Sequence, residues 1–310
     1  MTSHQVAEEQ KVKPPWLKQR LPAGFICEEV STLINNAKVH TVCQEAQCPN
    51  IWECFSRKTA TFMIMGDHCT RNCRFCAVAH GPNRFPNPEE PVRIAGMVQN
   101  LNLDYVVITS VTRDDLSDGG ASFFVQTVKE IRRKVPHAII ELLIPDFQGN
   151  KDALRSITEV RPDVINHNIE TVPRLYTIVR PEAIYQRSLD LLRQVVTFDS
   201  TIITKSGLML GLGEQPEEIL NTLKDLLDAG SQLVTMGQYL QPTKAHLPVE
   251  RYIPPKEFNN WHKIALEMGF AEVASGPFVR SSYHAKDLYQ AVNEFSSSSS
   301  NQRNKTPLNF

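Results

Sequence analysis

Six of the seven cysteines in this chain are crowded into two groups of three. The first group is Cys43, Cys48 and Cys54, with the spacing CxxxxCxxxxxC, and the second is Cys69, Cys73 and Cys76, with the spacing CxxxCxxC. A cysteine thiolate is a soft ligand that suits iron–sulfur clusters and zinc. Because each group offers three thiolates and such centres usually take four ligands, each group is predicted to leave one metal position open. A metal centre does chemistry at a position of that kind.

A closed zinc site is an alternative for the second group. Its three cysteines with His68 or His80 would form a tetrahedral site, and three cysteines with one histidine are a common structural zinc set. The seventh cysteine, Cys27, lies outside both groups. A lone cysteine is expected to be a small buried apolar residue.

The composition is that of an ordinary globular protein of 310 residues, in which 33 basic and 34 acidic side chains nearly cancel. No surplus of positive charge can neutralise a phosphate backbone, so we expect no nucleic-acid partner. The opening MTSHQVAEEQKVK is polar, and no run of 18 uncharged apolar residues occurs. We therefore expect no secretion signal, no membrane contact and a cytoplasmic location. In that reducing compartment, clustered cysteines indicate metal or redox chemistry rather than disulfides.

The two cysteine groups must be positioned by secondary structure, and the sequence has six short apolar segments rich in β-forming residues. They are residues 61–65, 105–110, 138–144, 163–169, 201–210 and 233–240. Amphipathic helical patterns lie between them, for example Phe124 and Val128 after the second segment and Ile219 and Leu223 after the fifth. Strand and helix alternating six times predict a parallel sheet, either a barrel or an open doubly wound sheet.

Polar residues gather where these strands end. They are residues 109–115, Asp146, residues 166–170, Glu214 and residues 238–241. In parallel α/β folds the carboxyl ends of the strands form the active face. The second cysteine group follows the first strand, so it is expected at that same face.

The segment CTRNCRFC, with Phe75 before its last cysteine, resembles the cluster motif of the radical S-adenosylmethionine superfamily. The resemblance implies that Cys69, Cys73 and Cys76 hold three irons of a four-iron, four-sulfur (4Fe-4S) cluster, and that the fourth iron binds the methionine part of S-adenosylmethionine. It also implies that Phe75 lines the adenine pocket.

Two further segments match that superfamily. DDLSDGGA contains Asp118, Gly119 and Gly120 after the second strand, where a backbone segment meets the methionine amine of the cofactor. GLMLGLGE contains Gly211 and Glu214 and resembles a strand motif of the same enzymes. Taken alone, each glycine-rich segment is also typical of a tight turn.

The first cysteine group narrows the resemblance to the lipoyl synthase family. CPNIWEC, TATFMIMGDHCTRNCRFCAVAHG, VVITSVTRDDLSDGG, NHNIETVPRLY, TKSGLMLGLGE, GQYLQPTKAHLPV and SGPFVRSSYHA together resemble its sequences, and the likeness covers about residues 14–288. The family inserts two sulfur atoms at carbons 6 and 8 of an octanoyl chain held on a lysine of a lipoyl carrier domain. These carbons are unactivated, so the resemblance implies that S-adenosylmethionine is cleaved to methionine and a 5′-deoxyadenosyl radical that abstracts hydrogen.

The resemblance also implies a second 4Fe-4S cluster at Cys43, Cys48 and Cys54, which donates its own sulfide. Carried over by position from the RSSY segment, Ser282 completes its ligands. From the residues alone, that segment is more typical of a turn with hydroxyls bonding the backbone than of a metal site. The implied partners are octanoylated carrier domains of 2-oxoacid dehydrogenase complexes or of the glycine cleavage system, and an electron donor such as ferredoxin or flavodoxin.

Three other polar residues are candidates for binding the cofactor. Asn168 and Glu170 follow the fourth strand and are suited to the ribose hydroxyls or the methionine part, although both types also terminate strands. Arg180 is suited to a carboxylate, because its guanidinium binds one through two hydrogen bonds. A surface salt bridge is its alternative.

The predicted architecture is a partial (β/α)6 barrel of the radical S-adenosylmethionine type. Residues 1–15 and 296–310 are expected to be disordered, 16–60 to carry the first cysteine group, 61–275 to form the barrel, and 276–295 to close the barrel mouth with the RSSY segment. Three alternatives remain at this point: another two-cluster radical enzyme with a different substrate, a zinc-stabilised binding protein, and an iron–sulfur electron carrier.

Overall fold

The computed structural model describes residues 13–18, 26–46, 48, 50–56, 61–81 and 84–293. The predicted terminal segment 296–310 and most of segment 1–15 lie outside these residues. Cys27 belongs to the described helix α2 (Ile26–Ala37), but its side chain lies outside the described part, so its burial stays a prediction.

One eight-stranded sheet forms the centre of the described fold, in the order β1-β2-β5-β6-β7-β8-β9-β10. The strands from β2 to β10 pair in parallel, and β1 joins β2 antiparallel at the edge. The bounds are β1 (His40–Thr41), β2 (Thr61–Ile64), β5 (Tyr105–Ser110), β6 (Ile139–Leu143), β7 (Val164–Asn166), β8 (Ile203–Leu210), β9 (Leu233–Gln238) and β10 (Glu272–Gly276).

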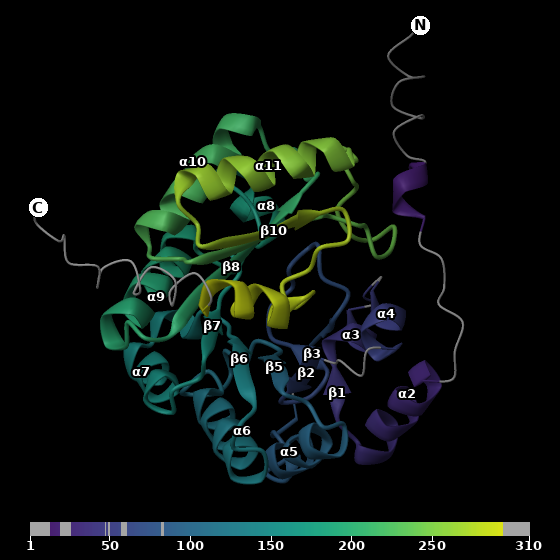
Figure 1. Ribbon diagram of the computed structural model, residues 1–310, viewed down its shortest axis with the longest axis vertical. Coiled ribbons are helices and arrows are strands. Elements are labelled where there is room, and N and C mark those ends of the chain that lie inside the picture. The colour runs from purple at the N-terminus through teal and green to yellow at the C-terminus, as the bar shows by residue number, and fades with distance from the viewer. Residues whose placement is uncertain are drawn as a thin grey trace, which may run out of the picture.

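Six helices follow the strands in turn and cover the outside of the sheet (Figure 1). They are α5 (Glu90–Asn100), α6 (Ala121–Lys134), α7 (Lys151–Glu159), α9 (Tyr185–Phe198), α10 (Pro216–Asp228) and α11 (Pro255–Met268). Each of the six predicted strand segments contains a strand, so the partial (β/α)6 barrel is confirmed. The structure adds β10 as a seventh parallel strand, which the sequence concealed because only Val273 of its five residues is fully buried.

The two faces of the sheet bury different partners. Val106 and Ile108 of β5 join the main hydrophobic core with the outer helices, whereas the intervening Tyr105 and Val107 face inward. Such alternation is what the two-residue period of a strand produces. At the amino ends of the strands, this inner face therefore has apolar side chains that need a cover of their own.

A C-terminal helix, residues 285–293, provides that cover at the amino ends of the strands. Leu288 and Val292 pack against Val164, Ile203 and Leu233, the last three lying at or next to the starts of β7, β8 and β9. In Figure 1 this helix is the yellow segment that crosses the interior of the ring of helices. Because the helix directly follows residues 280–283, its packing fixes where that segment enters the barrel.

A buried polar group ties four neighbouring strands together on the inner face. The Lys205 ammonium lies 2.9 Å from Glu141, and both side chains are fully buried. Glu141 also accepts hydrogen bonds from the Tyr105 hydroxyl (2.5 Å) and the Asn166 amide (2.9 Å). A buried charge is tolerated when it is paired and hydrogen-bonded in this way.

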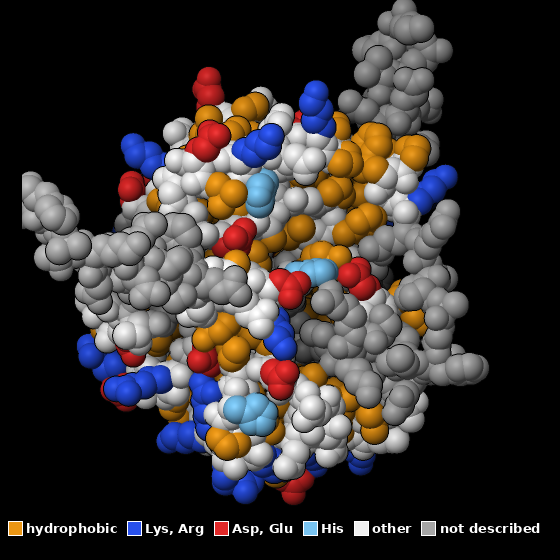
Figure 2. All heavy atoms as spheres, viewed as in Figure 1, with side chains coloured by type: hydrophobic (Ala, Val, Ile, Leu, Met, Phe, Trp, Pro, Cys, Tyr) orange, Lys and Arg blue, Asp and Glu red, His pale blue; other side chains and the backbone are white. Residues whose placement is uncertain are grey.

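Charged side chains of both signs are interspersed over the face seen in Figure 2, with apolar side chains between them. This distribution agrees with the near balance of basic and acidic residues in the sequence. Among the helices in the described ranges, none has the length and apolar character needed to span a bilayer.

Candidate functional site

A cavity of about 640 Å³ lies at the carboxyl ends of the parallel strands, and all six clustered cysteines line it. The barrel provides most of the wall, and residues 279–283 complete it from the C-terminal side. Five more residues of the predicted site line the same cavity: Phe75, Asn168, Glu170, Arg180 and Ser282. The chain thus brings its soft ligands and these five candidate site residues to one cavity.

The second cysteine group lies on the loop that follows β2. Cys69 belongs to the short strand β3 (His68–Cys69), which pairs with β4 (Ala79–His80). Two backbone N–H groups, those of Arg71 and Thr112, donate to the Cys69 sulfur over 3.4 and 3.3 Å. Hydrogen bonds to a ligating sulfur hold its orientation and tune the centre it binds.

Burial raises the pKa of two thiols in this group, Cys73 and Cys76. For Cys76 the pKa rises to about 12, first because of burial and then because the Cys73 and Cys69 thiols are close by. Burial also raises the pKa of Cys73, and the guanidinium of Arg180 opposes that rise. The three sulfurs are near enough to influence one another, so the group is suited to bind a positively charged centre that keeps them deprotonated.

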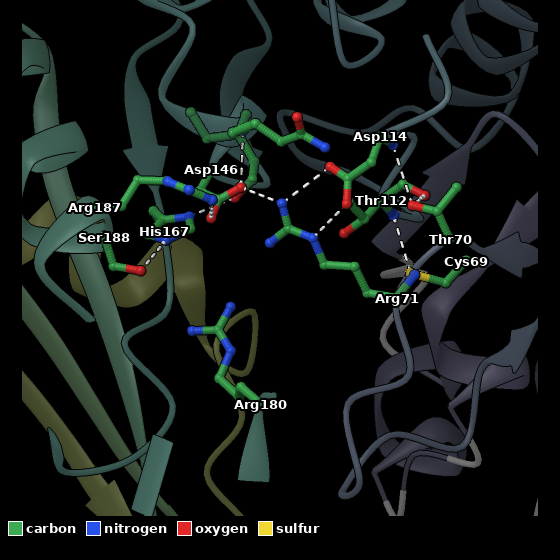
Figure 3. Close-up of polar contacts among 12 residues, drawn as sticks. Cys69, Thr70, Arg71, Thr112, Asp114, Asp146, His167, Arg180, Arg187 and Ser188 are labelled. Carbon is green, nitrogen blue, oxygen red and sulfur yellow. Dashed lines mark hydrogen bonds and ion pairs between the residues drawn. The ribbon is translucent and has the colours of Figure 1, made fainter. Parts of the chain in front are cut away.

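Arg71 anchors this loop to the barrel. Only 6% of the residue is exposed, and its guanidinium donates to Asp114 (2.6 and 3.0 Å) and Asp146 (2.5 Å). Asp146 also accepts from Arg187 of α9 over 3.2 Å, and Figure 3 shows the four side chains joined in one network. Burial alone would raise the pKa of Asp146, but the bonds and charge of Arg71 lower it well below its usual range.

Arg71→Met should lower the free energy of unfolding by about 3–5 kcal/mol, because removing one partner of a buried ion pair leaves an uncompensated charge. Denaturant unfolding followed by circular dichroism measures this loss. Arg93→Met is the control: it breaks the more exposed Arg93–Glu89 pair, where the expected loss is about 0–1 kcal/mol. Equal losses in the two variants would contradict the anchoring role of Arg71.

Two residues of the first cysteine group lie on short helices beside the cavity, Cys43 on α3 (Val42–Glu45) and Cys54 on α4 (Ile51–Ser56), and Cys48 lies between these helices. The Cys48 N–H donates to the Cys43 carbonyl (3.0 Å), which brings the two residues together. Burial raises the pKa of Cys43 to about 11 and also raises that of Cys48, where the guanidinium of Arg280 opposes the rise. Arg280 was not singled out from the sequence, although it begins the RSSY segment.

The C-terminal segment is held against this first group by hydrogen bonds from several elements. The Asn50 amide donates to the Phe278 carbonyl (2.6 Å), and the Tyr283 hydroxyl donates to the Glu53 carboxylate (3.0 Å). Deeper in the cavity, the Thr61 hydroxyl donates to the Ser282 hydroxyl over 2.8 Å. The fold therefore places Ser282 in the same cavity as three cysteines that precede it by more than two hundred residues.

Gly237 of β9 explains why the C-terminal segment can approach the sheet so closely. A Cβ atom at this position would lie 2.1 Å from the Val279 carbonyl oxygen, which is a severe clash with backbone. Only glycine leaves that space free. This glycine was not identified from the sequence, because nothing local in LVTMGQYL indicates the approach of a distant segment.

Three polar residues lie between the two cysteine groups. Arg180 donates to the Asn168 carbonyl (3.0 Å) and the Tyr176 hydroxyl (3.1 Å), and the Asn168 amide donates to Glu170 (3.0 Å). Burial raises the pKa of Glu170, and the nearby guanidinium of Arg180 opposes that rise. Within the described residues, two buried atoms of this set have no hydrogen-bond partner, Arg180 Nε and Asn168 Oδ1. Buried polar atoms are normally satisfied, so these two are suited to meet a bound molecule.

Five predicted cofactor-binding residues are not in the cavity wall that the described residues form: Asp118, Gly119, Gly120, Gly211 and Glu214. Asp118 accepts from the Gly120 and Ser122 N–H groups (2.9 and 2.8 Å) at the start of α6. Glu214 accepts from the Gly211 and Leu212 N–H groups (2.5 and 2.9 Å) in the loop after β8. Both carboxylates therefore stabilise the backbone of their own loops by hydrogen bonds and do not line the cavity.

Two glycines in these loops are also required because a Cβ atom would clash with a neighbouring side chain. Gly120 has a φ of +87°, and a Cβ there would lie 2.3 Å from the Met65 sulfur. Gly211 has a φ of +107°, and a Cβ there would lie 2.3 Å from the Gln238 amide nitrogen. Both backbone angles favour glycine. Met65 lies just before the loop of the second cysteine group, so Gly120 leaves room for the residue that leads into that loop.

The two histidines considered for zinc, His68 and His80, do not line the cavity that the described residues form. His68 hydrogen-bonds Asp67 over 2.7 Å, and His80 is exposed on β4. In the described ranges, no three His, Cys, Asp or Glu side chains converge on a position for a single metal ion. His167 is buried between the Ile144 carbonyl (2.8 Å) and the Ser188 hydroxyl (2.9 Å), as expected of a structural histidine, and burial lowers its pKa to about 4.

Comparison with known protein families gives a match over residues 63–226 to the radical S-adenosylmethionine superfamily. A lipoyl synthase of Desulfotalea psychrophila is 57% identical over 289 residues, covering 93% of this chain and 97% of the relative. A lipoyl synthase of Rubrobacter xylanophilus is 52% identical over 275 residues, covering 89% of this chain and 86% of the relative. The likeness thus includes both cysteine groups and the C-terminal segment.

Solved structures agree on the fold. Streptococcus suis SuiB bound to S-adenosylmethionine matches with a TM-score of 0.55 at 10% identity, covering 73% of this chain and 52% of that one. HydG, a maturase of the FeFe-hydrogenase, matches with a TM-score of 0.53 at 12% identity, covering 86% of this chain and 67% of that one. At such identities the likeness concerns the barrel alone.

Proposed function

The chain belongs to the lipoyl synthase family of the radical S-adenosylmethionine superfamily, and from this premise we propose which of its residues carry each part of the reaction. The reaction replaces two hydrogens, at carbons 6 and 8 of a carrier-bound octanoyl chain, by two sulfur atoms. S-adenosylmethionine and two 4Fe-4S clusters are its cofactors. The extent of the family likeness disfavours the zinc-stabilised binding protein and the simple electron carrier.

The cavity carries this proposal, because it gathers all six cysteines and Ser282 around one space. Cys69, Cys73 and Cys76 would hold one cluster, and Cys43, Cys48, Cys54 and Ser282 would hold the other. When bound, the cluster at the second cysteine group supplies one electron to S-adenosylmethionine, and the cluster at the first cysteine group supplies sulfur. The donor sets fit these roles: three thiolates leave an iron open, and three thiolates with an alkoxide close a cluster with one weaker ligand.

Cofactor contacts follow from where the polar side chains point. Asn168, Glu170 and Arg180 would bind S-adenosylmethionine, because Arg180 Nε and Asn168 Oδ1 are buried at the cavity without partners among the described residues. Phe75 would pack against its adenine. Asp118, Gly119, Gly120, Gly211 and Glu214 would contribute through the loops they shape, since none of them lines the cavity.

The two terminal segments would act as a wall that excludes water. Val42, Asn50 and residues 279–283 line the cavity beside the barrel, and Asn50, Thr61 and Asn168 bond the C-terminal segment in place. A carbon radical must be kept from other hydrogen sources, and a cavity walled by the barrel and the C-terminal segment would help to provide that protection. An extended octanoyl-lysine arm is narrow enough to enter such a cavity while its carrier domain stays outside.

The protein acts on lipoyl carrier proteins, as its family membership implies. We propose octanoylated domains of 2-oxoacid dehydrogenase complexes or of the glycine cleavage system as those carriers, and ferredoxin or flavodoxin as the electron donor. A cytoplasmic location stays a prediction. These choices are supported by the resemblance of the chain to its family.

Ser282→Ala tests the assignment of the last ligand. Product formation should fall at least about 10–100-fold, the loss expected even for an outer partner of a metal ligand, because Ser282 is proposed as a direct but weaker ligand. Cleavage of S-adenosylmethionine should fall far less, because the variant alters only the first cysteine group. Chromatography of 5′-deoxyadenosine and mass spectrometry of the carrier peptide measure the two reactions. Ser281→Ala is the comparison: its hydroxyl bonds Asn168, so the iron of the first group should be retained. Equal effects on cleavage and product in Ser282→Ala would contradict ligation.

A further inference from the structure

Thr61 lies where the two distant parts of the first metal site meet. It is the first residue of β2, only 4% exposed, and its register with Val107 of β5 fixes its backbone. Its side chain faces the cavity that also contains Cys43 and Ser282. Neither its residue type nor any local motif distinguishes it in the sequence.

The hydroxyl of Thr61 contacts a ligand from each end of the chain. It donates to the Ser282 hydroxyl over 2.8 Å. Burial raises the pKa of Cys43, and the backbone and hydroxyl of Thr61 oppose that rise. Among the described residues, Thr61 is the one side chain with a hydrogen bond to Ser282 Oγ, since Asn168 bonds the neighbouring Ser281 instead.

A serine needs such a partner to serve as a metal ligand. Its hydroxyl is neutral in water, and it binds a metal ion well only after it loses its proton. A nearby O–H group stabilises the resulting alkoxide, because a hydrogen bond to a charged oxygen is stronger than one between neutral groups. Outer partners of this kind orient metal ligands and raise affinity.

We propose that Thr61 is a positioning residue for the Ser282 ligand: its hydroxyl holds Ser282 Oγ toward the first cysteine group and stabilises the alkoxide. If Ser282 held an iron as an alkoxide, its hydroxyl proton would pass to solvent, and Oγ would take up a proton again when the iron left. Thr61 keeps its own proton throughout and sets how firmly the serine remains bound. This inference rests on the proposed ligation by Ser282.

Thr61→Val and Thr61→Ser separate the hydroxyl from the shape of the side chain. Valine keeps the volume of the threonine side chain but lacks the hydroxyl, whereas serine keeps the hydroxyl but lacks the methyl group. After anaerobic reconstitution of the full chain, iron and sulfide per chain are measured, together with the rate of iron loss to a chelator. Thr61→Val should lose iron from the first group about 10–100-fold faster than the unchanged protein, and Thr61→Ser should largely restore retention. Cleavage of S-adenosylmethionine, which depends on the second group, confirms that each variant is folded.

The double variant Thr61→Val with Ser282→Ala tests whether the effect passes through the serine. If it does, the double variant should lose iron no faster than Ser282→Ala alone. Fast iron loss in Ser282→Ala with normal retention in Thr61→Val would overturn the role of Thr61 and leave the ligand assignment intact. Normal retention in Ser282→Ala would instead overturn the ligation and the role of Thr61 with it. Equal losses in Thr61→Val and Thr61→Ser would show that the hydroxyl is not the cause.

Discussion

Cys73→Ala is expected to abolish cleavage of S-adenosylmethionine, with a loss of more than about 100-fold. Removing even an outer hydrogen-bond partner of a metal ligand lowers metal affinity or activity about 10–100-fold, and Cys73 is proposed as a direct ligand. The alanine would also leave Arg180 facing the cavity without the thiolate that its guanidinium favours. Formation of 5′-deoxyadenosine in the presence of a strong reductant measures the loss.

The seventh cysteine offers a matched control for this prediction. Cys27→Ala makes the same chemical change outside both groups and should leave cleavage intact. Iron content should fall in Cys73→Ala and stay unchanged in Cys27→Ala. If Cys73→Ala still formed 5′-deoxyadenosine at the normal rate, the assignment of the second group would be wrong.

Cys48→Ala is expected to give the opposite pattern: S-adenosylmethionine is still cleaved, but no sulfur enters the octanoyl chain. Cys48 belongs to the first group, beside Arg280 and Cys43, and the second group keeps all its ligands in this variant. Product should fall by more than about 100-fold, by the same reasoning about a direct ligand. Parallel assays of 5′-deoxyadenosine and of thiolated carrier peptide reveal the separation. Lipoyl product from Cys48→Ala would refute the role of the first group as sulfur donor.

Local periodicity was enough to predict a parallel α/β sheet, and the family resemblance favoured a barrel over an open sheet. Buried strands such as β2 and β5 are short segments rich in apolar residues, and the helices repeat apolar residues at helical spacing, as Phe124 and Val128 do in α6. Strand β10 escaped prediction because its five residues are mostly half-buried and small. Its place in the sheet depends on pairing with β9, which no local pattern records.

The candidate site could be predicted only where ligands lie close together in sequence. The cysteine groups are evident from their spacing, but the approach of Ser282 is a contact between segments 221 residues apart, as the bond from Thr61 shows. The resemblance to a family supplied that residue, and the structure supplied its partner. Arg71, Thr61 and Gly237 act through burial and close approach, which a single sequence does not reveal.

The central claim is that this cavity carries out two sulfur insertions on an octanoyl-lysine arm. The most direct test incubates an octanoyl-lysine carrier peptide with the anaerobically reconstituted protein, S-adenosylmethionine and a strong reductant, and then weighs the peptide by mass spectrometry. A mass gain equal to two sulfurs in place of two hydrogens is the predicted result. An unchanged peptide mass, with 5′-deoxyadenosine accumulating in the same tube, would contradict the claim and show that the radical chemistry serves another substrate.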